Sequence, residues 1–372
     1  MDKNILTIKN KRVLVAMSGG VDSSVAAALL VEQGYEVIGA TMQVWDYSAC
    51  EIQGGNEIQE GHGTCCSSLD VDDARSVADK LNIPFYVINC ETKFKEKVID
   101  PFIAGYLSGQ TPLPCVNCNT YLKFDHLIQK MKELDCSYLA TGHYAQIVER
   151  NGQSFIQTSE DDWKDQTYFL FTIQPEIIPH LLFPVGEYKK PQVRDLAKKW
   201  GLTVAAKKDS QGICFVGNQG YDHFIESQVS AEKLNAKKGL LKRYPSGVVM
   251  GEHQGIHHYT YGQSKGIGLN HHEKLFVIKV DAVDNTVWVG DEEYLFGDKV
   301  EIRKMHLLSE LEDNKEYLVK IRYQHKGSLA KIVKNADGYQ AQFLEKQRAI
   351  TPGQAAVIYD ENRLMGGGWI QI

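Results

Sequence analysis

The sequence predicts an α/β protein: a doubly wound parallel sheet, then a small central domain and a C-terminal antiparallel β-barrel. Up to about residue 145, short apolar runs alternate with helix-like segments. Strands that alternate with helices favour right-handed crossovers and therefore a parallel sheet. From about residue 240, glycines become frequent and apolar runs short, which is typical of antiparallel strands in a small barrel or sandwich.

Four strands and four helices are expected in the first part of the chain. The periodicity of apolar residues predicts strands at 13–17, 37–42, 85–89 and 138–141, and helices at 23–33, 69–81, 93–107 and 119–134. A doubly wound sheet binds ligands at the carboxyl ends of its strands. In this chain that rim carries Ser18, Met42 and Thr141-Gly142-His143.

The later segments predict a different architecture. The stretch "AQIVERNGQSFIQTS" is typical of a hairpin that turns at Asn151-Gly152. Residues 191–200 are typical of a helix that ends at Gly201. Antiparallel strands are expected in "LFVIKVDAVDNTVWVG", "EYLVKIRYQ", "YQAQFLE" and "QAAVIYD". The expected domains are 1–222, 223–283 and 284–372.

Composition is that of a globular protein. A chain of 372 residues exceeds one ordinary core, and its 43% apolar and 24% charged content is usual for such proteins. The first ten residues lack the apolar core of a signal peptide, and no apolar run approaches the ~20 residues of a membrane helix. A cytoplasmic location without a membrane partner is therefore expected.

Positive charge is concentrated locally, although the net charge of −6 argues mildly against a nucleic-acid partner. Lysine and arginine dominate residues 187–208. A second basic stretch contains Lys233, Lys237, Lys238, Lys242 and Arg243. Each stretch fits either a solvated helix face or a surface for a polyanion.

The junction "VLVAMSGGVDSSVAAALL" at residues 13–30 has the composition of an anion site. A glycine-rich turn between a strand and a helix exposes backbone N–H groups beside the positive end of the helix. Ser18, Ser23 and Ser24 add hydroxyl donors. Asp22 disfavours a bare phosphate, which indicates a nearby Mg²⁺ ion. The motif is neither a Walker A loop, which needs GxxxxGK[ST], nor GxGxxG.

This junction resembles the PP-loop of the N-type ATP pyrophosphatases, which split ATP between the α and β phosphates and leave AMP on a carbonyl-type oxygen. The resemblance implies an adenine nucleotide alpha hydrolase-like sheet, with ATP and Mg²⁺ as cofactors. Met42 by itself is more typical of a core residue. By resemblance, ATP would contact Ala16, Met17, Ser18, Gly19, Gly20, Val21, Asp22, Ser23, Met42 and Gly142.

Three of the eight cysteines have distinctive surroundings. Cys115 and Cys118 lie in "TPLPCVNCNTYLKF", and Cys214 lies in "KKDSQGICFVG". Cys118 fits an activated thiolate, because Asn119 or Thr120 can begin the next helix. The alternatives are a metal half-site for the first two, although no second CxxC completes it, and a buried small side chain for Cys214. The remaining cysteines are expected to be structural: Cys50, Cys65, Cys66, Cys90 and Cys136.

Together with the PP-loop, these segments resemble the tRNA-specific 2-thiouridylases, which thiolate the wobble uridine of certain tRNAs. The resemblance covers most of the chain. Its motifs are "AMSGGVDSS", "GTCCSSLDVDDAR", "CNTYLKFD", "ATGHYA", "KDQTYFLF", "DSQGICFVG", "GIHHYTYGQSKGIG" and "AITPGQAAVIYD" followed by "GGGWI".

The resemblance implies a two-stage reaction. Adenylation would turn the C2 oxygen of uracil into a good leaving group, and sulfur would then replace it, with release of AMP and pyrophosphate. Cys214 would carry persulfide sulfur received from a sulfur-relay protein or a cysteine desulfurase. Cys118 would attack that persulfide to release sulfide, or resolve it as a Cys118–Cys214 disulfide.

The enzyme would also have to hold the anticodon stem-loop and present one unstacked base. Tyr323 fits a base-stacking residue or a buried strand tyrosine equally well. With RNA as substrate, the basic stretch at 189–208 is expected to contact the RNA backbone. By resemblance, Leu113, Pro114 and Cys115 would line the target base, and Lys164, Asp165, Gln166, Arg322 and Tyr323 would contact tRNA.

The chain departs from the family pattern at two positions. Cys115 stands where many relatives carry aspartate, so the acid or base role of that residue is not transferred. The thiols of Cys115, Cys118 and Cys214 could instead hold an iron–sulfur cluster. Ser264 stands where relatives often have arginine, which removes one phosphate contact.

Two other functions fit parts of the pattern. A PP-loop enzyme that adenylates a small amide or acid would explain the loop but leave Cys118 and Cys214 without a role. A nucleotide-binding sensor would need Gly19 and Gly20 but neither Asp22 nor the two thiols.

Overall fold

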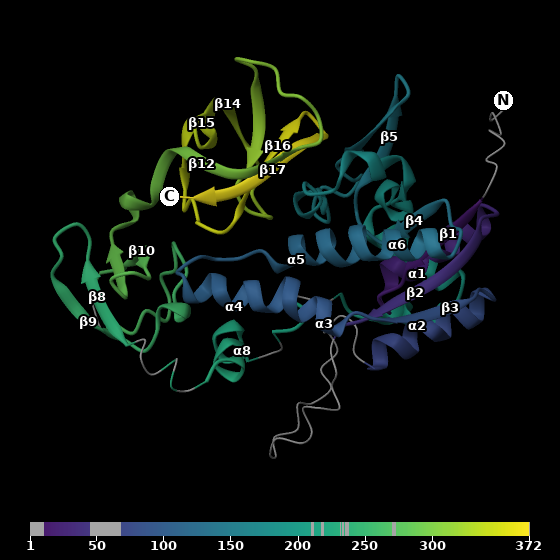
Figure 1. The fold of residues 1–372 in the computed structure, drawn as a ribbon, viewed down its shortest axis with the longest axis horizontal. Helices are drawn as coiled ribbons and strands as arrows, with labels where there is room; N and C mark the ends of the chain where they lie inside the picture. Colours follow the sequence, from purple (N-terminus) through teal and green to yellow (C-terminus); the bar gives the residue numbers. More distant parts are fainter. Residues whose placement is uncertain are drawn as a thin grey trace. The chain divides into compact units, whose positions relative to one another are not determined.

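The computed structural model describes residues 11–44, 68–209, 212–216, 219–230, 232, 234, 238–269 and 273–371 (Figure 1). Cys50, Cys65, Cys66, Lys233 and Lys237 lie outside the described residues. The chain forms two compact units. The first combines Met1–Lys95 with Cys118–Phe215, and the second combines Glu96–Asn117 with Val216–Ile372.

A parallel sheet with the strand order β3-β2-β1-β4-β7 organises the first unit. The four predicted strands are confirmed to within one residue at each end. β7 was not predicted, because two residues are too short for a pattern. The strands are β1 (Arg12–Ala16), β2 (Glu36–Gln43), β3 (Phe85–Asn89), β4 (Tyr138–Thr141) and β7 (Leu181–Leu182).

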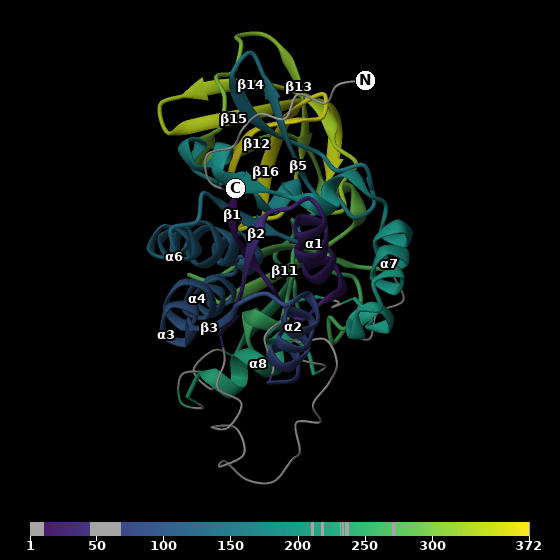
Figure 2. The ribbon, with the colours of Figure 1, turned by 90° about the vertical axis from the view of Figure 1, so that its right-hand side faces the viewer.

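Helices cover both faces of this sheet (Figure 2). One face packs on α1 (Val21–Glu32), α2 (Ser68–Leu81) and α7 (Lys190–Lys199). The other face of β1 and β4 packs on α6 (Leu127–Glu133). Val13, Leu14 and Val15 of β1 are consequently all fully buried, as the central strand of a doubly wound sheet requires.

Two predicted helices are longer and less regular than expected. The first comprises α3 (Glu91–Phe94), the π-helical η1 (Lys95–Ile99) and α4 (Asp100–Leu107). The second comprises α5 (Pro114–Asn117), the π-helical η2 (Cys118–His126) and α6. The prediction that Asn119 or Thr120 begins this helix is wrong, because helical turns start at Pro114. Proline suits a first helical turn, where its missing N–H has no partner to lose.

The predicted hairpin is confirmed in β5 (Gln146–Arg150) and β6 (Gln153–Gln157). Its turn residues Asn151 and Gly152 have φ angles of 53° and 74°. Both positive values are what a two-residue type I′ turn needs, and asparagine followed by glycine supplies them at low cost.

The second unit contains α8 (Tyr221–Gln228), a small mixed sheet and a barrel. The small sheet has the order β10-β11-β8-β9, with β8 (Gly239–Arg243), β9 (Val249–His253), β10 (Phe276–Asp281) and β11 (Thr286–Gly290). The C-terminal strands form a closed antiparallel barrel and not a sandwich, since β12 pairs with both β15 and β17. Its strands are β12 (Phe296–Leu307), β13 (Glu316–Lys320), β14 (Ser328–Asn335), β15 (Gly338–Arg348), β16 (Ala355–Asp360) and β17 (Arg363–Gln371).

Short 3₁₀ segments connect these elements. They are η3 (Thr167–Phe169), η4 (Pro175–His180), η5 (Pro184–Glu187), η6 (Thr203–Ala206), η7 (Ile256–His258) and η8 (Glu292–Leu295). Within the described ranges, no helix combines the length and the apolar character needed to cross a membrane.

Candidate active site

The PP-loop, residues 18–24, links β1 to α1 through a tightly held turn. Gly19 has a φ of +69°, and a Cβ there would lie 2.2 Å from the Asp70 carbonyl oxygen. The Ser18 N–H donates to Ser23 Oγ at 3.1 Å, and Ser24 Oγ donates to the Gly20 carbonyl at 2.8 Å. These bonds fix the loop, while the first N–H groups of α1 lack partners within the helix and favour an anion.

The end of β4 packs directly on this loop. A Cβ at Gly142 would lie 2.5 Å from the Ser23 backbone nitrogen, so only glycine fits there without displacing α1. β2 and β4 flank β1 on opposite sides, and ligands bind doubly wound sheets at such a reversal of strand order. The PP-loop and Gly142 are therefore the two sides of one rim.

His143, next to Gly142, is a buried and neutral imidazole. Its Nε2 lies 3.3 Å from Lys123 Nζ, and its Nδ1 lies 2.6 Å from Thr141 Oγ1. Because an ammonium group only donates, Nε2 accepts and Nδ1 carries the proton. Burial and then Lys123 hold the pKa of His143 well below its usual value.

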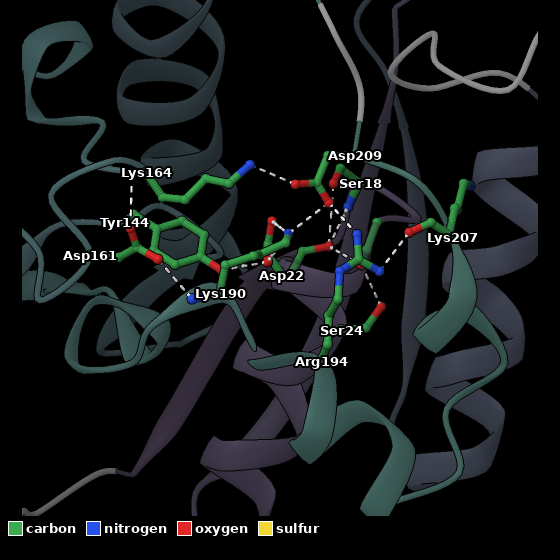
Figure 3. A network of polar contacts seen from close by, with 12 residues as sticks. Ser18, Asp22, Ser24, Tyr144, Asp161, Lys164, Lys190, Arg194, Lys207 and Asp209 are labelled. Carbon is green, nitrogen blue, oxygen red and sulfur yellow. Dashed lines mark hydrogen bonds and ion pairs between the residues drawn. The ribbon is translucent and has the colours of Figure 1, made fainter. Parts of the chain in front are cut away.

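Asp22 is paired on both of its carboxylate oxygens (Figure 3). Lys190 Nζ lies 2.8 Å from each oxygen, and the Tyr144 hydroxyl donates to Oδ1 at 2.9 Å. Lys190 is only 8% exposed, and Tyr144 is also buried. Burial, and then the neighbouring Asp22 carboxylate, raise the pKa of Tyr144, so the phenol stays protonated and donates.

Asp209 collects three cationic side chains beside the loop (Figure 3). Its carboxylate lies 2.7 Å from Lys164, 2.9 Å from Lys190 and 2.6 Å from Arg194. Partial burial raises the pKa of Asp209, but hydrogen bonds from Lys164 and Lys190 outweigh that effect and lower it to about 2. An ionised carboxylate thus holds a cluster of cationic groups next to the turn.

Lys207 joins α2 to the same turn. Its Nζ lies 2.6 Å from Asp70 and 2.5 Å from Asp73, and it donates to the Gly19 carbonyl at 3.1 Å. This bond fixes the Gly19 carbonyl. The loop conformation therefore depends on residues far away in the chain.

These contacts revise the interpretation of the basic stretch at 189–208. Lys190, Arg194 and Lys207 are directed at carboxylates around the PP-loop and not at solvent. Lys198 and Lys199, with side chains 68% and 65% exposed, fit the predicted RNA-facing surface better. The sequence indicated these cations only through the density of positive charge, and it did not predict a role for Asp209.

The segments that carry Cys118 and Cys214 meet at the short helix α3. η2, which Cys118 begins, packs against α3. Cys90 immediately precedes α3, and burial followed by the proximity of Cys118 raises the pKa of Cys90 to about 11. Phe215, the neighbour of Cys214, contacts Phe94 edge-to-face with ring centroids 5.6 Å apart. Cys118 and Cys214 are both half-buried.

The segment predicted to touch tRNA is largely committed to internal contacts. The buried Asp165 carboxylate accepts the Ser159 N–H and the Thr167 hydroxyl, and Gln166 accepts the Tyr144 N–H. The neighbouring Trp163, which was not among the predicted RNA contacts, is 84% exposed.

In the second unit, the barrel holds the segment that carries the predicted base-binding residues. Thr111 donates its N–H to the Pro352 carbonyl at 2.9 Å, and its carbonyl accepts from Gln354 at 3.0 Å. The motif "ITPGQ" therefore anchors the backbone of Thr111 to the barrel. Following Thr111, Leu113 is half-buried, Pro114 is buried and Cys115 is exposed.

The remaining predicted residues lie at the rim, in the core or on a barrel turn. Ala16 ends β1 and Met42 lies near the end of β2, where Met42, Met17 and Val21 are buried with the core. Tyr323 is half-buried in the turn after β13 and is not a strand residue. Beside it, Arg322 donates to the Arg348 carbonyl at 3.1 Å.

Comparison with known proteins assigns the chain to a family. Residues 11–218 match the family described as tRNA methyl transferase HUP domain, residues 227–291 the tRNA methyl transferase PRC-barrel domain, and residues 297–370 the aminomethyltransferase beta-barrel domain. The chain is 46% identical over 373 residues to tRNA-specific 2-thiouridylase MnmA of Clostridium botulinum, covering 98% of this chain and 99% of that one. It is 44% identical over 366 residues to the protein of the same name from Geotalea uraniireducens, covering 98% and 96%. The chain therefore belongs to the tRNA-specific 2-thiouridylase family.

Proposed function

We propose that the protein catalyses ATP-dependent 2-thiolation of the wobble uridine of tRNA. The observation that carries this proposal is that one unit combines a PP-loop, surrounded by lysine and arginine side chains, with the segments of Cys118 and Cys214, which both contact α3. The near full-length similarity to proteins named tRNA-specific 2-thiouridylase supports it.

In the first stage, the C2 oxygen of uracil attacks the α phosphate of ATP and pyrophosphate leaves. We propose that ATP contacts residues 16–23, Met42 and Gly142, as the family resemblance implies. Lys190 and Arg194 add cations that exchange a carboxylate partner for phosphate oxygens. Such groups stabilise the charge that develops on the departing pyrophosphate.

Mg²⁺ fits the oxygen donors of the loop. The Asp22 side chain is 31% exposed, and the hydroxyls of Ser18 and Ser23 in the same loop lie 3.3 Å from each other. Mg²⁺ prefers a carboxylate combined with phosphate oxygens. We propose that Asp22 holds it when ATP is present, with Lys190 released to the phosphates. The ion would neutralise charge on the phosphate groups.

In the second stage, Cys214 carries a persulfide received from a sulfur-relay protein or a cysteine desulfurase. Cys118 thiolate attacks Cys214 Sγ, which forms the Cys118–Cys214 disulfide and expels hydrosulfide. Hydrosulfide attacks C2, and AMP leaves with the original oxygen. The two cysteines supply the two electrons that reduce the persulfide sulfur, and a thiol reductant restores them.

We propose that residues 1–222 perform this chemistry and that domains 223–283 and 284–372 help to bind the tRNA. We also propose that the protein acts in the cytoplasm. Leu113, Pro114 and Cys115 would line the base, and Lys164, Asp165, Gln166, Arg322 and Tyr323 would contact RNA. Trp163 adds an exposed aromatic face on which a base can stack.

One experiment tests the function. The protein is incubated with ATP, Mg²⁺, a persulfide donor and unmodified tRNA, and digested RNA is examined for 2-thiouridine by mass spectrometry. We expect 2-thiouridine and pyrophosphate in equal amounts. If no 2-thiouridine forms and pyrophosphate is released only when a small amide or acid is added, the protein would instead be a PP-loop enzyme that adenylates such a small molecule. An iron–sulfur mechanism would instead require a brown anaerobic preparation whose colour is lost with Cys115→Ser, Cys118→Ser or Cys214→Ser.

A further inference from the structure

A cluster of two histidines and a glutamate lies in the second unit, in a segment to which the proposed reaction gives no role. Within the part of the chain that the structure describes, Glu226, His257 and His258 are the one group of potential metal ligands whose donor atoms all lie within 4.8 Å of one another. Glu226 comes from α8, and the histidines come from η7, between β9 and β10. Two separate elements therefore converge on one point.

The distances in this cluster fit ligands around an ion. Glu226 Oε1 lies 3.4 Å from His257 Nε2 and 3.2 Å from His258 Nε2. Direct hydrogen bonds between a charged imidazole and a carboxylate are shorter, about 2.7–2.9 Å. A tetrahedral ion with bonds of about 2.0–2.1 Å holds neighbouring ligand atoms roughly 3.3 Å apart. One carboxylate oxygen facing two Nε2 atoms at this spacing matches that arrangement.

Neighbouring residues support the histidines in this role. Asp222 lies one turn before Glu226 on α8, and its Oδ2 is 3.5 Å from His258 Nδ1. Metal-bound histidines usually direct their second nitrogen at a carboxylate, which fixes the ring. A Cβ at Gly255 would lie 2.4 Å from the His257 ring, so the glycine provides the space in which this ring sits.

One of the three side chains is buried and the other two are partly exposed to solvent, so an ion can reach the cluster from solvent. His257 is 1% exposed, whereas the side chains of His258 and Glu226 are 28% and 42% exposed. The buried ring anchors the site and the other two ligands border solvent. Two imidazoles and one carboxylate, with a fourth position open to water, suit Zn²⁺.

We propose that His257 Nε2, His258 Nε2 and the Glu226 carboxylate bind one Zn²⁺ ion. The ion joins α8 to the segment between β9 and β10 and stabilises the second unit. This inference does not depend on the thiolation reaction.

The test uses the full-length protein after removal of metal with a chelator. Zn²⁺ is titrated in competition with a chromophoric chelator, and Co²⁺ is used as a visible-absorbing probe. We expect one equivalent of Zn²⁺ per chain and a higher thermal midpoint with Zn²⁺. Glu226→Gln and His258→Gln should each weaken binding at least 10-fold, and Asp222→Asn should weaken it about 10-fold.

Matched variants separate this site from other sources of binding. His223, exposed on the same helix, provides the control His223→Gln, which should bind Zn²⁺ as the wild type does. The double variant Cys118→Ser, Cys214→Ser should also keep the site. Zn²⁺ binding that survives Glu226→Gln and His258→Gln in folded proteins, or that disappears in the cysteine double variant, would overturn the proposal.

Discussion

Lys190 Nζ lies 2.8 Å from both carboxylate oxygens of Asp22, and this ion pair is the point at which α7 meets the PP-loop. Lys190 is also 2.9 Å from Asp209 and nearly buried, so its ammonium group depends on these two carboxylates. ATP phosphates would offer it a stronger partner. When ATP binds, Lys190 would therefore exchange Asp22 for phosphate oxygens.

Replacing Lys190 should impair adenylation. Lys190→Ala removes a preorganised cation beside the phosphates, and such losses typically lower rates by about 100-fold or more. The measurement is kcat/KM for ATP in tRNA-dependent pyrophosphate release. Lys199→Ala, assayed with tRNA at saturation because Lys199 borders the predicted RNA-facing surface, is the matched control, since Lys199 is also on α7 but has a 65% exposed side chain. Equal activity of Lys190→Ala and Lys199→Ala would contradict a role at the phosphates.

Alanine variants of Gly19 and Gly152 should separate the cost of a left-handed backbone from the cost of a steric clash, because the two glycines have nearly the same conformation. Gly19 and Gly152 have φ angles of +69° and +74°, but a Cβ meets the Asp70 carbonyl only at Gly19. Both alanine variants carry the left-handed backbone cost of roughly 1 kcal/mol. Gly19→Ala should therefore lower the thermal midpoint further and abolish ATP binding, while Gly152→Ala keeps ATP binding. Similar losses in both variants would show that close packing at Gly19 is unimportant.

Asp209 should give the stability a specific pH dependence. Its pKa is lowered to about 2 from the ordinary 3.8, so its ion pairs stabilise the fold fully above about pH 4 and lose that effect as the pH falls toward 2. Asp209→Asn should be less stable at pH 7 by up to about 2 kcal/mol. Thermal midpoints of both proteins from pH 7 to pH 3 provide the measurement. A gap that stays constant or widens toward acid would contradict the assignment.

Cys90 offers a control for the cysteine chemistry. It neighbours Cys118, but burial, and then Cys118, raise its pKa to about 11, so it remains a thiol at neutral pH. We expect Cys90→Ala to form 2-thiouridine, and Cys118→Ser and Cys214→Ser to form none. Iodoacetamide at pH 7 should also modify the exposed Cys115 before Cys90, as peptide mass spectrometry can measure. Loss of thiolation in a folded Cys90→Ala protein would require a different pair of thiols.

Local pattern was sufficient for four of the five strands of the parallel sheet. β3 and β4 begin and end at the predicted residues, and the Asn151-Gly152 turn forms as expected, because apolar periodicity and turn chemistry act within a few residues. The helical segment predicted to begin just after Cys118 starts earlier, at Pro114. Its first residue, Pro114, is equally compatible with a loop and a helical first turn, so local preference did not decide between them.

The sequence by itself determined the parallel sheet, the PP-loop at its rim and the cysteines that the family resemblance singles out. Only the tertiary structure decided which charges serve that loop. Lys164, Lys190, Arg194 and Asp209 are separated along the chain and carry no motif that tells a solvated side chain from a buried one. Their pairing depends on how α7 and the following segment pack beside β1, and ion pairs gain strength only where such packing excludes water.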